Sequence, residues 1–466
     1  MPLIKSVSGI RGTIGGKPGE NLTPADLLKF TSAYAAFLKK RSGKEKIKVV
    51  LGRDARISGL MVSQIVLGTL SACGADVVNI GLATTPTTEA AVCELAADGG
   101  IILTASHNSK NWNALKLLNE KGEFLSAADG NELLSIVENL DDEIHYVSVD
   151  QIGEILQNDE MLRLHTNKIL KHELIDKSAI QTKSFKIVVD GINSVGALAV
   201  PFLLRELGVH DCIVINGEAN GEFAHNPEPL AENLTEIRKR VVAENADLGI
   251  VVDPDVDRLA FISEDGSMFG EEYTLVAVAD YVLQHKKGDL VSNLSSSRAL
   301  CDIAERYGVQ YFASAVGEVN VVEEMKKRQA LIGGEGNGGV IFPEIHNGRD
   351  ALTGTALFLS HLAKSGKTCS ELRKTYPDYK MLKSKIALDS PASLDAVLTQ
   401  MKEHFRENPA AEINTVDGVK IDFEKSWVHL RKSNTEPIIR IYAEADTEYK
   451  ADELVNIIKQ LIGQPK

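Results

Sequence analysis

Short apolar segments alternate with helical patterns along most of this chain, and this alternation limits the fold more than any other feature of the sequence. Residues 46–51, 75–80 and 101–103 have the apolar, β-branched character of strands, and residues 58–72 and 87–97 between them have helical periodicity. Strands that alternate with helices indicate βαβ units and a mainly parallel sheet. The sequence therefore predicts an α/β fold.

The same alternation returns after a polar, acidic region that ends near residue 165. Strand patterns at residues 185–189 and 248–252 indicate a second α/β unit, and a third unit begins near Leu259. From about Pro377 the chain becomes more charged and has the pattern of a smaller α+β unit. A chain of 466 residues is long enough for several such domains.

Charge and hydropathy exclude several classes of protein. The net charge of −14 argues against non-specific binding to nucleic acid or to anionic membranes. The N-terminus lacks the apolar core of a signal peptide, and no apolar run approaches the roughly 18 residues of a membrane span. The cysteines are scattered, without the spacing of a zinc site, at Cys73, Cys93, Cys212, Cys301 and Cys369. We therefore expect a cytoplasmic protein that binds neither nucleic acid nor membranes.

The strand at residues 101–103 leads directly into a polar loop that contains Ser106, His107 and Asn108. In an open α/β sheet, ligands bind beyond the ends of the strands, so this loop is a candidate ligand site. A Ser-His-Asn triplet alone is also typical of a turn or a helix cap.

Three aspartates follow the apolar strand at residues 248–252. In extended chain, Asp253, Asp255 and Asp257 point the same way and direct three carboxylates at one point. Such a group needs a cation, and ligation by oxygen alone suits Mg²⁺. A solvated acidic turn is the alternative, whereas a calcium loop of the EF-hand type would need glycine where Arg258 stands.

Cations gather at several loops of this acidic chain. Arg431, Lys432 and Arg440 lie within ten residues of one another, among hydroxyl side chains. Guanidinium groups with hydroxyl donors suit a phosphate dianion, although a solvated charged turn has the same composition. Arg11 and Arg56 add cations at other loops, and each alone is typical of a surface salt bridge.

A glycine-rich segment at residues 334–339 formally matches the G-x-G-x-x-G pattern of dinucleotide-binding proteins. Here it precedes the strand-like residues 340–342 and not a helix, so the dinucleotide interpretation fails. The loop could instead present Glu335 and Asn337 to neighbouring hydroxyls of a polyol. A plain glycine-rich turn is the alternative.

Taken in order, these four segments resemble the motifs of the α-D-phosphohexomutase superfamily, which includes phosphoglucomutases, phosphomannomutases and phosphoglucosamine mutases. The phosphoserine, metal, sugar-binding and phosphate-binding loops correspond to residues 104–108, 253–258, 335–338 and 431–440, respectively. The resemblance covers essentially the whole chain. It implies four domains around a central cleft, namely three related α/β units with mixed sheets and a smaller C-terminal α+β domain.

The resemblance assigns one motif to each domain. The four are a phosphoserine domain, a metal-loop domain, a sugar-binding domain and a phosphate-binding C-terminal domain. We place them at residues 1–155, 156–258, 259–372 and 373–466, respectively.

The resemblance also implies catalytic roles. Ser106 would be the phosphorylated serine, and its oxygen would bind one Mg²⁺ together with Asp253, Asp255 and Asp257. Lys116 falls at a lysine that acts as a general acid/base in the family. The other catalytic assignments are Arg11 and Arg258, near the transferred phosphate, and His107.

For the substrate, the resemblance implies that Glu335 and Asn337 contact sugar hydroxyls. Asn337 replaces a serine that is common in this loop, and Gly339 stands where many members carry histidine. This form of the sugar-binding loop resembles that of the archaeal-type branch, whose members are phosphoglucosamine mutases or hexose-phosphate mutases of broad specificity. The residues implied for the non-reacting phosphate are Arg431, Ser433, Asn434, Thr435 and Arg440.

The expected activity is that of a phosphoglucosamine mutase, an intramolecular phosphotransferase of the isomerase class. It would interconvert glucosamine 6-phosphate and glucosamine 1-phosphate through phosphorylated Ser106 and a bisphosphorylated sugar, with a hexose bisphosphate as activator. A phosphoglucomutase/phosphomannomutase of broad specificity is the alternative within the family, and a non-catalytic sugar-phosphate-binding protein is the alternative outside it. We expect a monomer or a homodimer whose ligand is a sugar monophosphate.

Overall fold

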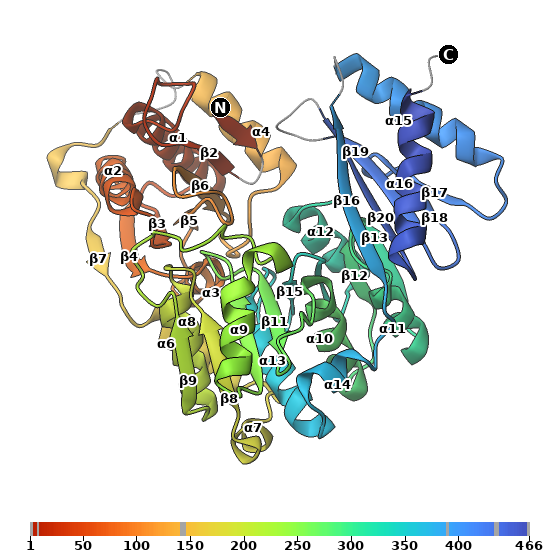
Figure 1. The fold of residues 1–466 in the computed structure, drawn as a ribbon. Coiled ribbons are helices and arrows are strands. Elements are labelled where there is room, and N and C mark those ends of the chain that lie inside the picture. Colours follow the sequence, from red (N-terminus) through yellow and green to blue (C-terminus); the bar gives the residue numbers. More distant parts are fainter. Residues whose placement is uncertain (1–2, 7–8, 140–145, 388–390, 433–437, 464–466) are drawn as a thin grey trace. The chain divides into compact units, whose positions relative to one another are not determined.

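The computed structural model describes residues 3–6, 9–139, 146–387, 391–432 and 438–463. The chain forms two compact units (Figure 1). The first contains Met1–Thr274 and Gly338–Ser370, and the second contains Leu275–Asn337 and Glu371–Lys466. Within the described residues, no helix has the length and apolar character required to span a membrane.

The first unit begins with a seven-stranded mixed sheet of order β1-β2-β6-β5-β3-β4-β7. Its strands are β1 (Ile4–Ser6), β2 (Gly9–Thr13), β3 (Lys48–Arg53), β4 (Asp76–Leu82), β5 (Gly99–Leu103), β6 (Trp112–Leu118) and β7 (Ile155–Gln157). The strands β3, β4, β5 and β7 run parallel, as the alternating pattern predicts. β6 runs antiparallel to β5 and returns the chain across the sheet.

Helices cover both faces of this sheet because side chains alternate along each strand. The helices in this stretch of chain are α1 (Pro24–Ser42), α2 (Gly59–Ala72), α3 (Thr85–Glu94) and α4 (Ala127–Glu138). Val49 and Ile101 pack with α1, α2 and α4 on one face. Val50 and Ile102, each one residue further along, pack against α3 on the other. The loop after β5 therefore leaves a strand that is buried on both faces.

A four-stranded sheet of order β11-β10-β8-β9 forms the next part of the first unit. The elements along this stretch are α6 (Met161–Leu170), α7 (Lys177–Lys183), β8 (Lys186–Asp190), α8 (Gly196–Leu207), β9 (Asp211–Ile215), α9 (Thr235–Ala243), β10 (Leu248–Val252) and β11 (Leu259–Ser263), with a short 3₁₀ helix at Ala231–Asn233. Another 3₁₀ helix, Val149–Gln151, precedes β7. The sequence predicted that a third unit begins near Leu259, but in the structure Leu259 is the first residue of β11, which belongs to the second sheet. β11 pairs antiparallel with β10 and completes the second sheet, so the aspartate loop joins two neighbouring strands.

The second unit contains the parallel strands β12 (Leu290–Asn293), β13 (Tyr311–Ser314) and β14 (Ile332–Glu335). The other elements of this stretch of chain are α10 (Glu271–His285), α11 (Ala299–Tyr307) and α12 (Glu318–Arg328). The chain then enters the first unit with β15 (Gly339–Ile341) and α13 (Ala351–Ser365), before α14 (Cys369–Arg373).

The C-terminal part is a five-stranded antiparallel sheet of order β16-β20-β19-β18-β17 with two helices. Its elements are β16 (Lys380–Ala387), α15 (Pro391–Arg406), β17 (Glu412–Asn414), β18 (Val419–Asp422), β19 (Trp427–Lys432), β20 (Ile438–Ala445) and α16 (Glu448–Gly463). Met401 of α15 and Ile458 of α16 are fully buried against strand residues such as Ile441. Three α/β units with mixed sheets are thus followed by a smaller α+β unit, as predicted.

Candidate active site

Ser106 lies in the first unit, three residues beyond the end of β5, and its side chain points toward the aspartate loop after β10. Its Oγ donates a hydrogen bond to Asp253 Oδ2 at 2.8 Å, and its backbone N–H donates to Thr104 Oγ1 at 3.0 Å. Its φ is +47°, a conformation that costs energy for a residue with a β-carbon. The surrounding structure must therefore hold this loop in place.

Arg56 supplies much of that support. Its side chain is completely buried, and its Nε donates to Asp54 Oδ2 at 3.0 Å. The guanidinium nitrogens donate to four carbonyl oxygens of the serine loop, those of Ser106 (2.5 Å), Asn108 (2.7 Å), Ser109 (2.7 Å) and Trp112 (3.0 Å). The surface salt bridge expected for a lone arginine is wrong here, because the Arg56 side chain and its partner Asp54 are both fully buried.

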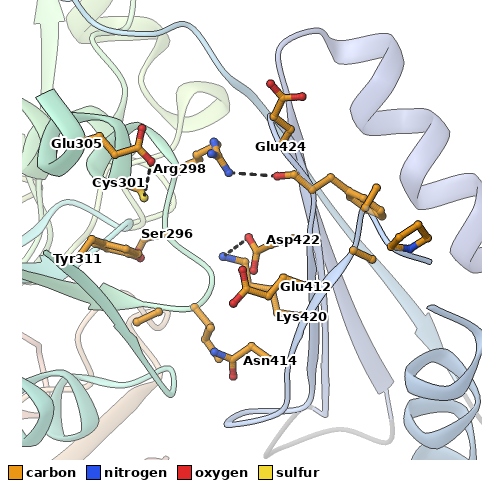
Figure 2. Close-up of a pocket in the computed structure, with 16 residues that line it drawn as sticks. Ser296, Arg298, Cys301, Glu305, Tyr311, Glu412, Asn414, Lys420, Asp422 and Glu424 are labelled. Carbon is orange, nitrogen blue, oxygen red and sulfur yellow. Dashed lines mark hydrogen bonds and ion pairs between the residues drawn. The ribbon is translucent and has the colours of Figure 1, made fainter. Parts of the chain in front are cut away.

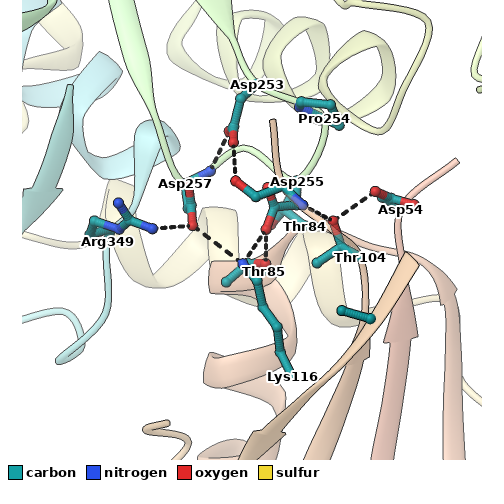
Figure 3. A network of polar contacts seen from close by, with 12 residues as sticks. Asp54, Thr84, Thr85, Thr104, Lys116, Asp253, Pro254, Asp255, Asp257 and Arg349 are labelled. Carbon is teal, nitrogen blue, oxygen red and sulfur yellow. Dashed lines mark hydrogen bonds and ion pairs between the residues drawn. The ribbon is translucent and has the colours of Figure 1, made fainter. Parts of the chain in front are cut away.

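The three aspartates predicted as metal ligands come together at the end of β10, and all are fully buried. Asp253 Oδ1 accepts the backbone N–H groups of Asp257 and Arg258, each at 3.1 Å, while its Oδ2 accepts the Ser106 hydroxyl. Figure 3 shows the aspartates beside Lys116 and Arg349. Their ligand atoms lie within 4.8 Å of one another, which is close enough for one metal ion.

The hydrogen bonds of Asp255 and Asp257 leave one oxygen of each unused. Asp255 Oδ2 accepts from Thr85 Oγ1 at 2.6 Å and from Lys116 Nζ at 2.7 Å. Asp257 Oδ2 accepts from Arg349 Nη2 at 2.6 Å. The Oδ1 atoms of both residues are buried and have no hydrogen-bond partner among the described residues. Buried carboxylate oxygens are costly without a partner, so the donor set fits a hard cation such as Mg²⁺.

The charges of this cluster are strongly coupled. Burial raises the pKa of Asp253, and the charges of Asp257 and Asp255 raise it further. Burial alone would lower the pKa of Lys116, but Asp255 and Asp257 hold that pKa above its ordinary value. Lys116 is therefore an ammonium group at neutral pH and carries a proton into the site.

Two arginines and a neutral histidine surround the serine. Arg11 Nη1 donates to Asn108 Oδ1 at 3.2 Å, and the Nδ1 atom of His107 lies 3.5 Å from Ser106 Oγ. Burial, followed by the charges of Arg258 and Arg11, lowers the pKa of His107 to about 2. Burial and the neighbouring Arg258 also lower the pKa of Arg11. Cations that disfavour one another in this way would be stabilised by an anion such as a phosphate group.

The residues predicted for the substrate lie in the second unit. Glu335, at the end of β14, accepts from Asn293 Nδ2 at 2.7 Å and from the backbone N–H of Gly317 at 3.1 Å. Its other oxygen accepts from Asn337 Nδ2 at 3.4 Å. These bonds fix the carboxylate in the glycine loop that the sequence singled out.

Arg431 and Arg440 are direct partners across β19 and β20. Arg431 Nε lies 3.3 Å from Asp417 Oδ2. Two like charges at paired positions destabilise a sheet, so the pair favours an anionic ligand. Ser433, Asn434 and Thr435 lie outside the described residues.

A pocket of about 670 Å³ in the second unit contains none of these residues. Its lining includes Arg298, Glu412, Lys420 and Asp422 (Figure 2). Arg298 Nη1 donates to the carbonyl of Phe423 at 3.2 Å, and Lys420 forms an ion pair with Asp422 at 3.1 Å. The cations of this pocket are thus bound by the protein itself.

Comparison with known proteins identifies the family of this chain. Four models of phosphoglucomutase/phosphomannomutase domains match, those of α/β/α domains I, II and III at residues 3–143, 164–266 and 270–379 and of the C-terminal domain at residues 385–461. The chain belongs to the phosphoglucomutase/phosphomannomutase family. It is accordingly a phosphohexomutase, an enzyme of the isomerase class.

Individual relatives extend over the whole chain. A phosphoglucomutase/phosphomannomutase of Thermococcus kodakarensis is 38% identical, over 97% of this chain and 98% of that protein. A phosphoglucosamine/phosphogalactosamine mutase of Sulfurisphaera tokodaii is 34% identical, over 99% of both chains. The crystal structure of a putative phosphomannomutase from Thermus thermophilus has a TM-score of 0.83, 25% identity and complete coverage of both chains.

Three residues of this phosphohexomutase contact the site although the sequence did not mark them for it. Arg56 shapes the serine loop, Thr85 binds Asp255, and Arg349 binds Asp257. Arg349 is 92 residues from its partner in the chain, so no local pattern connects the two. The role of Arg56 could have been suspected from the sequence, because this cation follows closely after a buried strand, β3.

Proposed function

We propose that Ser106 carries a phosphoryl group and exchanges it with a hexose monophosphate. The bond from phosphorus to Ser106 Oγ breaks as a bond to a sugar hydroxyl forms, which gives a sugar bisphosphate. The proton of that hydroxyl ends on Ser106 Oγ, and Lys116 moves it, because its ammonium group can give one proton and take another. In the second half of the reaction Ser106 takes the other phosphate back.

The contact between Ser106 and Asp253 is the observation that carries this proposal. The serine hydroxyl lies 2.8 Å from one carboxylate of a buried acidic group whose other members have oxygens without hydrogen-bond partners among the described residues. Binding alone would require no nucleophile at this point. Asp253, Asp255 and Asp257 would hold Mg²⁺, which would neutralise negative charge on the transferred phosphoryl group.

In the same proposal, residues of the second unit recognise the substrate. Glu335 and Asn337 would bind sugar hydroxyls in both orientations of the bisphosphate. Arg431 and Arg440, with Ser433, Asn434 and Thr435, would hold the phosphate that is not reacting. A hexose bisphosphate would load unphosphorylated Ser106 and so act as activator.

For the substrate, we propose glucosamine 6-phosphate and glucosamine 1-phosphate. The charge near the sugar loop supports an amino sugar. Gly317, whose amide binds Glu335, is followed directly by Glu318, a second acidic residue that is only 8% exposed. A second acidic residue directly after the amide that binds Glu335 adds negative charge to this region, which favours an ammonium group over a neutral hydroxyl. The mutase of Sulfurisphaera tokodaii is named for amino sugars.

A phosphoglucomutase/phosphomannomutase is the second candidate. The relative from Thermococcus kodakarensis, at 38% identity, has that name and supports it. The two candidates predict different preferences among the same small set of sugar phosphates.

The test compares turnover of the 1-phosphates of glucosamine, glucose and mannose by the purified, primed enzyme with Mg²⁺. The first candidate predicts the highest kcat/KM for glucosamine 1-phosphate, and a fall in that preference for Glu318→Gln. Turnover of the glucose and mannose phosphates without turnover of the amino sugar would contradict the first candidate and support the second. Loss of all turnover in Ser106→Ala is expected for both.

A further inference from the structure

A second buried group of metal-binding side chains lies in the first unit, apart from Ser106 and the aspartate loop. His165 projects from α6, His346 from the loop between β15 and α13, and Asp350 from the N-cap of α13. We propose that these three side chains form a structural site for a transition metal ion of the zinc type. The proposal is independent of the substrate and of the phosphoryl-transfer mechanism.

The distances suit one small ion. Nε2 of His165 lies 3.1 Å and Nε2 of His346 lies 3.3 Å from Oδ2 of Asp350, and all three ligand atoms lie within 4.8 Å of one another. Zinc binds nitrogen and oxygen at about 2.0–2.2 Å in a tetrahedron, which separates neighbouring ligand atoms by about 3.4 Å. The three side chains are therefore close to that spacing already.

The Nε2 atom of His346 points to a missing ligand. The side chain is 8% exposed, and this nitrogen has no hydrogen-bond partner among the described residues. It faces Asp350 at 3.3 Å without the alignment of a hydrogen bond. A buried polar nitrogen in this state costs stability unless something occupies its lone-pair direction, and a metal ion would do so.

The protonation states agree with this assignment. Burial lowers the pKa of His346, so its imidazole is neutral at neutral pH. Burial alone would raise the pKa of Asp350, but His165 and His346 hold that pKa below its usual range, so the group is a carboxylate. Neutral imidazole and carboxylate are the forms that ligate metals.

The outer hydrogen bonds can orient both rings. Nδ1 of His165 lies 3.1 Å from Thr87 Oγ1. Nδ1 of His346 accepts the backbone N–H of Gly348 at 3.1 Å and lies 3.5 Å from Glu89 Oε2. Metal binding at Nε2 requires the tautomer with hydrogen on Nδ1. In that tautomer Nδ1 would no longer accept the N–H of Gly348 and would instead donate to the carboxylate of Glu89. Carboxylates commonly orient metal-binding histidines in this way.

The ligand chemistry distinguishes this site from the aspartate loop. Two imidazoles and one carboxylate favour Zn²⁺ and similar ions, whereas three carboxylates favour Mg²⁺. The ion would join α6 to the start of α13, so its expected effect is on stability.

The experiment measures zinc in the full-length, tag-free protein. The protein is stripped with a chelator, incubated with Zn²⁺ in an excess of Mg²⁺, desalted, and analysed for metal content and for Tm. We expect one zinc per chain and a higher Tm than with Mg²⁺ alone. His346→Gln retains the volume and polarity of the side chain but loses the ligand, so its zinc Kd should rise at least about 100-fold.

His172→Gln is the matched control, because His172 also pairs with a carboxylate, Glu344, at 2.9 Å but lies outside the three-residue group. It should retain one zinc. The proposal is overturned if the wild-type protein retains no zinc, or if His346→Gln and His165→Gln retain as much as His172→Gln. The absence of zinc from the wild-type protein overturns the proposal whether or not a variant folds, and two histidine variants are available to locate the ion.

Discussion

At the scale of single residues, the proposed chemistry depends on one serine held in an unfavourable backbone conformation. The positive φ of Ser106 places its hydroxyl on Asp253, and buried Arg56 stabilises the loop through its carbonyl oxygens. The nucleophile and its support are therefore separate side chains with separate effects. Substitution of either one can be measured independently.

Arg56→Lys should reduce kcat/KM by roughly 100-fold, because lysine retains the charge but cannot reach several carbonyls at once, and a small displacement of a reacting group has a cost of that order. Steady-state kinetics measure the effect. Arg53→Lys is the control, since Arg53 Nη1 donates to a single carbonyl, that of Asp54, at 3.1 Å. Equal kinetics for the two variants would contradict the role given to Arg56.

Asp257→Asn should weaken Mg²⁺ binding by at least about tenfold, because a neutral amide replaces a buried anionic ligand. Calorimetric titration of the chelator-treated protein measures the affinity. Asp265→Asn is the control, because Asp265 is exposed in the turn after β11. Unchanged Mg²⁺ affinity in Asp257→Asn would show that the ion does not bind at the aspartate loop.

At the scale of elements, local sequence patterns located most of the framework. The helical pattern at residues 58–72 corresponds to α2, which extends from Gly59 to Ala72. The strand at residues 248–252 is β10 as predicted, and its apolar run ends where the aspartates begin. These elements follow from side chains that are neighbours in the chain.

Other features depend on partners far along the chain and had no local signal. β6, which carries Lys116, was not expected, because the stretch up to Asn113 is largely polar. β11 completes the second sheet by pairing with β10, and only tertiary contacts decide that pairing. The acidic group itself was predictable from one loop, but its contacts with Thr85 and Arg349 were not.

An ion pair at the end of β8 should make stability depend on pH. His225 Nε2 lies 2.9 Å from Asp190 Oδ2. Burial alone would lower the pKa of His225, but Asp190 raises it above the ordinary value of about 6.5. The stabilisation is therefore complete below the ordinary pKa and is lost as pH rises through the raised pKa of the folded protein.

The difference in Tm between the wild-type protein and His225→Gln should accordingly be larger near pH 6 than near pH 9. Differential scanning calorimetry across this range measures it. His210→Gln, at an exposed histidine, is the control and should show no such trend. A difference that grows as pH rises would contradict the sign of the pKa shift.

At the scale of the whole molecule, the chain carries a net charge of −14 but concentrates cations where phosphate groups are proposed to bind. Arg11, Arg258 and Lys116 lie around Ser106 in the first unit, and Arg431 and Arg440 are paired in the second. In the proposed function, the four family domains would supply a phosphoryl-transfer group and a substrate-binding group from different parts of the chain.

The phosphorylation of Ser106 is the most direct test of the proposed phosphoryl-transfer mechanism. Phosphatase-treated protein, freed of phosphatase, is incubated with glucose 1,6-bisphosphate and Mg²⁺, and intact mass and peptide mapping then locate any added group. The proposed mechanism predicts one phosphoryl group, on Ser106, in the wild-type protein and in Ser109→Ala, and none in Ser106→Ala. No added phosphoryl group in the wild-type protein, or equal phosphorylation of Ser106→Ala, would contradict it.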